Sequence, residues 1–103
     1  VNEGRLSLNQ LINLLCENPV KIFGIQNKGF IKKDYDADFT IIDMEKIIEI
    51  KNENIQSKCG WSPFVGHTFR SSILGTWVNG ERVFDGRRVV ETTTHSMALN
   101  FSR

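Results

Sequence analysis

Residues 73–84 read ILGTWVNGERVF, in which two runs of β-branched and aromatic residues flank the dipeptide Asn79-Gly80. Asn-Gly between two such runs is a strong hairpin signal, because both central residues of a type I′ turn need positive φ. The stretch therefore predicts one strand over residues 73–78, a two-residue turn, and a returning strand over residues 81–84.

Further strand signals lie on both sides of this hairpin. Downstream, Asp85-Gly86 predicts a second tight turn before another strand over residues 87–90. Upstream, residues 37–43 read ADFTIID, which is typical of a strand, and residues 47–50 form a shorter candidate. In the tail, Met97, Leu99 and Phe101 alternate with other residues, so the last residues are expected to run extended.

Helical signals come earlier in the chain. Ser7 and Gln10 have the spacing of a capping box. An apolar stripe at helical spacing follows at Leu8, Leu11, Ile12 and Leu15. We expect this helix to end near Cys16. Asn18-Pro19 then predicts a second, short helix that ends at Gly24. Helices followed by a meander of strands place the chain in the α+β class.

The composition limits the classes of function. The chain has 103 residues, 40% of them apolar and 24% charged, with a net charge of +1. These values are typical of a globular domain, and the lack of a basic patch argues against a nucleic-acid partner. No apolar run is long enough for a membrane span. Cys16 and Cys59 are far apart, which predicts free thiols. Since the chain begins at Val1 and not at methionine, we expect it to be part of a longer one.

Residues 57–67, SKCGWSPFVGH, look most like a site. Cys59 and His67 could be a nucleophile and its base, but no third residue that would orient the base is evident. The aromatic residues could stack on a ligand. Such clusters more often cover a sheet edge or a domain seam. We therefore favour a loop that covers such an edge or seam, with Cys59 as a small apolar residue and His67 as a surface imidazole.

Two groups of charged residues are candidate binding sites. Asp34, Asp36, Asp38 and Asp43 could surround a cation, but they lack the glycine and the closing glutamate of a calcium loop. Arg87-Arg88 could hold an anion, but adjacent strand residues point to opposite faces. The two histidines lie far apart and form no HxH or HExxH motif, so a metal site made of Cys59, His67 and remote carboxylates stays open but has no support in the sequence.

Four segments together resemble the amidohydrolase superfamily, and in particular the dihydroorotase family within it. GRLSLNQLINLLCENPVKIFGI (residues 4–25) is similar to the last helical segment of the barrel, and KGFIKKDYDADFTIID (28–43) to the strand that enters the small β-sandwich. KCGWSPFVGHTFRSSILGTWVNGERVFDG (58–86) resembles a W-S-P-F loop followed by a hairpin, and MALNFSR (97–103) resembles the end of some bacterial members. Asp34 stands where the family often has glycine, so that turn is expected to be strained or of another type. The resemblance also implies that residues 57–67 form a structural loop whose aromatic rings pack inward, with an exposed His67 and a partly buried, free Cys59.

The resemblance implies a division of the chain and a longer parent. Residues 1–28 would be the terminal helical segment of a (β/α)8 barrel, and residues 29–103 the C-terminal part of the β-sandwich. The parent would be a zinc-dependent, cytoplasmic homodimer that interconverts N-carbamoyl-L-aspartate and dihydroorotate. The family's metal ligands and catalytic residues match nothing here, so no residue of this chain is assigned a catalytic, substrate-binding or metal-binding role. Its partner would be the remainder of the parent chain.

Two other functions stay open. The chain could belong to another cyclic-amide hydrolase, such as a hydantoinase or an allantoinase. It could also be a β-rich interaction module that folds without an enzyme around it.

Overall fold

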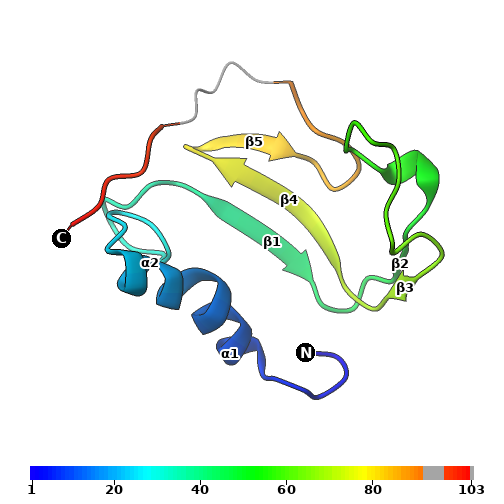
Figure 1. Ribbon diagram of the computed structural model, residues 1–103, viewed down its shortest axis with the longest axis horizontal. Helices are drawn as coiled ribbons and strands as arrows, with labels where there is room; N and C mark the ends of the chain where they lie inside the picture. Colours follow the sequence, from blue (N-terminus) through cyan, green and yellow to red (C-terminus); the bar gives the residue numbers. More distant parts are fainter. Residues whose placement is uncertain (92–96, 103) are drawn as a thin grey trace. The chain divides into compact units, whose positions relative to one another are not determined.

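A computed structural model describes residues 1–91 and 97–102 (Figure 1). The chain divides into two compact units, with the boundary after Ala37. The division after residue 28 that the family resemblance implied stays a prediction. The first unit holds residues 1–37 and the described tail, residues 97–102, and the second begins at Asp38. Helix in the first unit and sheet in the second confirm the α+β class.

The first unit contains one helix built from three consecutive segments, α1 (Leu8–Ile12), the π-helical η1 (Asn13–Glu17) and α2 (Asn18–Phe23). Its start confirms the predicted capping box. The Gln10 amide donates to the Ser7 hydroxyl at 3.2 Å, and the Ser7 amide donates to the Gln10 side chain at 2.7 Å. Two of the four amides that an N-terminus leaves unpaired are thereby satisfied.

The predicted break between two helices was wrong. Asn18 has helical φ and ψ, and its amide donates to Asn13 across a π turn, so Figure 1 shows α1 and α2 as consecutive turns. Pro19 explains the π segment, because proline has no amide hydrogen and its ring clashes with the carbonyl four residues earlier. A wider turn just before the proline relieves that clash without ending the helix.

Gly24 ends the helix as predicted, with φ of 65°. The Ile25 amide then donates to the Val20 carbonyl at 2.9 Å, which is the long bond of a Schellman cap. The tail also runs extended, as expected, because Phe101 forms an antiparallel bridge with Ile25.

The second unit contains a three-stranded antiparallel sheet in the order β1-β4-β5. Its strands are β1 (Phe39–Asp43), β4 (Ser72–Val78) and β5 (Glu81–Phe84). β4 is central, and β1 pairs with it from Phe39 opposite Trp77 to Asp43 opposite Ser72. The Trp77 ring lies across Gly75, where a Cβ atom would be 2.7 Å from the ring. Glycine at this position therefore lets the large ring lie flat on the strand.

The hairpin between β4 and β5 is confirmed. Asn79 and Gly80 have φ of 49° and 82°, as a type I′ turn requires, and Val78 lies opposite Glu81. The Asn79 amide donates to the Asp38 carboxylate at 2.9 Å, so the residue before β1 holds the turn in place.

The Asp85-Gly86 turn is present, but the strand predicted after it is reduced to one bridge, between Phe84 and Val89. Gly86 has φ of 93°, and the Asp85 carboxylate accepts hydrogen bonds from the amides of Arg87 and Arg88. These amides are occupied by the turn, so they are not available for a longer β ladder.

A second, two-stranded sheet joins β2 (Ile48–Glu49) to β3 (Thr68–Phe69). The sequence predicted β2 but missed β3, as well as the 3-10 turn η2 (Asn52–Asn54). Two residues are too few to show the alternation by which a strand is recognised.

Neither unit has a hydrophobic core within the described residues. No large apolar side chain is buried, and Ser72, which is 7% exposed, is the buried polar residue. The apolar stripe of the helix remains accessible, with Leu15 69% exposed. A segment folded alone would lack the apolar burial that offsets the conformational entropy of folding.

The turn at Asp34 gives a first prediction. Asp34 has φ of 67°, within the turn that the Tyr35 amide closes onto the Lys32 carbonyl. Left-handed φ costs a non-glycine residue energy, so Asp34→Gly in the intact protein should raise the free energy of unfolding by about 0.5–1 kcal/mol. Lys33→Gly is the matched control and should lower it. Denaturant melts that rank the two variants in the opposite order would contradict the strain at Asp34.

The hairpin gives a second prediction. Gly80→Val in the intact protein should lower the free energy of unfolding by about 2 kcal/mol, because a β-branched residue resists the φ of 82° found here. Glu81→Val is the control, since the next residue is already in β5, where valine is favourable. Equal thermal shifts for the two variants would show that the turn does not depend on positive φ.

Candidate functional site

The loop of residues 57–67 is held at its end by β2 and β3. The Ile50 amide donates to the His67 carbonyl at 2.9 Å, and the Gly66 amide donates to the Ile50 carbonyl at 2.8 Å. Inside the loop, the Ser62 hydroxyl accepts from the Phe64 amide at 3.1 Å. Hydrogen bonds of the backbone and of the Ser62 hydroxyl therefore fix the turn around Pro63, and the aromatic side chains of the loop are not needed for it.

The loop brings three rings together. Phe64 lies edge-on to both His67 and Phe69, with ring centroids 6.0 Å and 6.1 Å away, and His67 stacks on Phe69 at 6.4 Å. His67 is exposed, as expected. The expectation that the aromatics pack inward was wrong for this chain, because Trp61 is 64% exposed and Phe64 is also exposed. The contacts of Phe64 with His67 and Phe69 leave most of its surface accessible, since Phe64 is 53% exposed.

Cys59 is a free thiol, as predicted, but it is exposed and not partly buried. Its sulfur lies 3.1 Å from the Ser57 hydroxyl. This hydroxyl, followed by the Trp61 backbone, lowers the pKa of the Cys59 thiol below its ordinary value by stabilising the thiolate. The sequence analysis missed this contact, although the spacing Ser-x-Cys on a turn could have suggested it.

Cys59 and His67 have different neighbours. The sulfur contacts Ser57 and Trp61, whereas the imidazole contacts two phenylalanine rings. A nucleophile and its base must be in hydrogen-bond reach of one another. The structure therefore gives the pair no catalytic geometry and favours the structural interpretation of the loop.

The aspartates considered as a cation site have separate structural partners. Asp36 forms an ion pair with Lys28 at 3.0 Å, and the Asp43 carboxylate accepts from the Glu45 amide at 2.9 Å. Asp38 binds the hairpin turn, and Asp34 is in the strained turn. Across residues 1–91 and 97–102, no three His, Cys, Asp or Glu side chains gather at a point where they could hold a metal ion.

Arg88 lines an open hollow in the second unit. The other lining residues are Arg82, Asp85, Val89, Val90 and Glu91. Two arginines face two acids there, so the hollow has no net charge that would select an anion. Hydrogen bonds from the Arg88 and Arg87 amides lower the pKa of the Asp85 carboxyl, because they stabilise its charged form. Arg87 and Arg88 are thus structural through their backbone amides.

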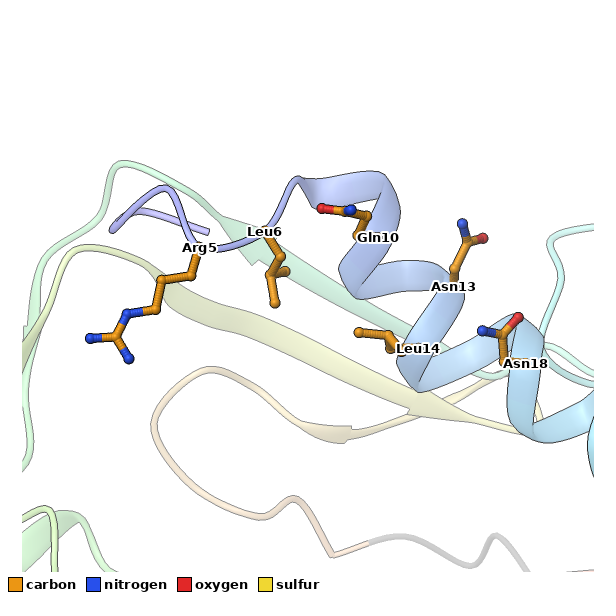
Figure 2. A pocket seen from close by; sticks show the side chains of 6 residues that line it. All are labelled: Arg5, Leu6, Gln10, Asn13, Leu14 and Asn18. Carbon is orange, nitrogen blue, oxygen red and sulfur yellow. The ribbon is translucent and has the colours of Figure 1, made fainter.

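A second open hollow lies along the helix of the first unit. Figure 2 shows the side chains that line it, Arg5 and Leu6 from the segment before the helix and Gln10, Asn13, Leu14 and Asn18 from successive turns. Arg5 forms an exposed ion pair with Glu3 at 3.0 Å. Amide side chains on the outside of a helix bring no acid, base or nucleophile together, so the hollow offers no chemistry.

Within the described residues, no helix is both long enough and apolar enough to cross a bilayer.

A solved structure and several curated proteins similar to this chain carry the names of enzymes. The L-hydantoinase (dihydropyrimidinase) from Arthrobacter aurescens matches with a TM-score of 0.79 and 33% identity, over 87% of this chain and 20% of that one. The dihydroorotase of Pyrococcus furiosus is 37% identical over 99% of this chain and 27% of its own length. That of Endomicrobium trichonymphae is 42% identical over 82% of this chain and 20% of its own.

The chain thus spans about a quarter of the length of the curated relatives it matches. The family model described as "Amidohydrolase family" matches residues 1–83, which include the helix, the loop and the hairpin. These matches confirm the family resemblance found in the sequence, and the chain belongs to the amidohydrolase family.

Proposed function

We propose that the protein to which this chain belongs is a dihydroorotase. It would hydrolyse the ring amide of (S)-dihydroorotate with one water to give N-carbamoyl-L-aspartate, and run the reverse reaction in de novo pyrimidine biosynthesis. The observation that carries the proposal is the similarity to a dihydroorotase over 99% of the chain. Several further dihydroorotases match most of the chain.

The second candidate is a hydantoinase, which also opens a cyclic amide. The structural match to the Arthrobacter aurescens enzyme supports it. We favour dihydroorotase because the identity to the Endomicrobium trichonymphae and Pyrococcus furiosus enzymes, 42% and 37%, exceeds the 33% to the hydantoinase. Membership in a hydrolase family argues against a stand-alone interaction module, and no observation favours allantoinase.

We propose that this chain has a structural role in the parent enzyme and supplies no catalytic residue. Residues 1–28 would complete the barrel of the parent, and residues 29–103 would build part of its small β-sandwich. The exposed apolar faces support this role. Leu8, Ile12 and Leu15 are exposed on the helix, and Phe39 and Ile41 on β1. Exposed apolar residues on one face of a helix or strand are typical of an interface. Its partner would be the remainder of the parent chain.

A zinc ion is proposed for the parent and not for this chain. Zinc sites use several His, Cys or carboxylate ligands that converge on one point. The described residues do not fit such a site, since no three side chains of these types gather. His67 stands among phenylalanine rings, and Cys59 beside a serine. The acid–base and metal chemistry would therefore be supplied by residues outside this chain.

Two further properties rest on the family resemblance alone. We propose that the parent is cytoplasmic and that it forms a homodimer.

The proposed activity predicts a substrate preference. The intact protein should hydrolyse dihydroorotate with a kcat/KM at least about tenfold above that for hydantoins, since a site built for one substrate's polar groups rejects an analogue that lacks them. Loss of the dihydroorotate chromophore in the ultraviolet measures the reaction. Residues 1–103 alone, supplied with zinc, should give no turnover above a metal-free blank. A preference for hydantoins would favour the second candidate, and turnover by the isolated chain would overturn the structural role.

The structural role predicts a context-dependent stability effect. Leu15 is 69% exposed in this chain, so if the parent covers it, Leu15→Ala should cost the parent about 2–5 kcal/mol of unfolding free energy. Asn9→Ala, at an exposed polar position of the same helix, is the control and should change it by less than about 0.5 kcal/mol. Denaturant melts that give the two variants the same stability would show that the stripe stays in water in the parent.

A further inference from the structure

The tail and the end of the helix are joined by backbone hydrogen bonds. The Ser102 amide donates to the Gly24 carbonyl at 2.7 Å, and the Gln26 amide donates to the Asn100 carbonyl at 2.8 Å. Between these bonds, Phe101 bridges Ile25 in antiparallel pairing. Figure 1 shows the described tail beside the end of α2. Residues far apart in the sequence thus form a short β ladder within the first unit.

Gly24 makes this ladder possible in a second way, besides its positive φ. A Cβ atom built at Gly24 would overlap the carbonyl oxygen of Ser102. Asparagine tolerates the left-handed conformation that ends a helix, but it carries a Cβ. The helix cap alone would accept asparagine at position 24. The close approach of the tail requires glycine there.

The side chains of the tail are only partly buried against the first unit. Leu99 and Phe101 remain 44% and 49% exposed, and Met97 is exposed as well. The ladder depends on a few backbone hydrogen bonds at the surface, and such segments open locally before the protein unfolds. The helix end has its own closure, because the Ile25 amide donates to Val20 and not to the tail.

We propose that residues 100–102 form a reversible latch, which binds the end of the helix through the hydrogen bonds to Gly24 and Gln26. The latch can close because residue 24 is glycine and has no Cβ atom. When the latch is closed, the tail is part of the first unit, which the chain leaves after Ala37. When open, it frees the tail and leaves the helix intact, because the two sets of hydrogen bonds share no amide. This inference does not depend on the substrate of the parent.

Amide hydrogen exchange at single-residue resolution in the intact protein tests the latch. The Gln26 amide reports the latch, and the neighbouring Ile25 amide reports the helix cap. In Gly24→Asn, exchange at Gln26 should rise by about tenfold or more, while exchange at Ile25 should change by less than about threefold. Asn100→Ala is the matched control and should change neither, because the latch uses the Asn100 carbonyl and not its side chain.

A second variant keeps the test decisive if Gly24→Asn does not fold. Ser102→Pro removes the amide hydrogen that binds Gly24 and leaves the helix sequence unchanged, and it should produce the same selective rise at Gln26. Unchanged exchange at Gln26 in the folded variants would overturn the latch. An equal rise at Ile25 and Gln26 would also overturn it, since the tail would then be an inseparable part of the helix end.

Discussion

Burial of apolar surface is the requirement that this chain does not meet with its own described residues. A helix with an apolar stripe and a sheet with an apolar face are stable when another layer covers them. Here the stripe at Leu8, Ile12 and Leu15 stays exposed, as do Phe39 and Ile41 on β1. The matched segment is about a quarter to a fifth of the length of these relatives, and our proposal is that the rest of an amidohydrolase covers the exposed faces.

Local polar contacts nevertheless define the geometry of each unit. The capping box starts the helix, and the Asp38 carboxylate holds the hairpin turn through the Asn79 amide. The Asp85 carboxylate organises the next turn through the amides of Arg87 and Arg88. These bonds form between near neighbours or across one strand pair, so they need no core. They explain how a segment with little burial has well-defined turns.

The loop around Cys59 shows why residue types alone are poor evidence for a site. A cysteine, a histidine and a tryptophan within a few residues suggest catalysis or ligand stacking. In the structure, the histidine stacks on Phe69 and the cysteine contacts Ser57. The chemistry of a nucleophile requires a base in contact with it, and the loop keeps the two apart. We therefore interpret the loop as a covering element, whose exposed aromatic rings would pack against another surface of the protein.

The sequence by itself determined the features that depend on neighbouring residues. The capping box, the left-handed Gly24 and the type I′ turn were predicted, because each follows from the φ or hydrogen bonds that particular side chains allow. The positive φ of Asp34 agrees with the strain that the family resemblance implied as one alternative for that turn.

Tertiary structure alone decided what depends on distant residues. One local feature also escaped the sequence: the π turn before Pro19 keeps one helix where two were predicted, since a helix tolerates proline if the preceding turn widens. Two contacts join segments that are far apart in the sequence and share no local pattern. They are the pairing of β2 with β3 and the approach of Ser102 to Gly24. The exposure of Trp61 and Cys59 also escaped the sequence, because burial depends on which surfaces meet and not on which residues are apolar.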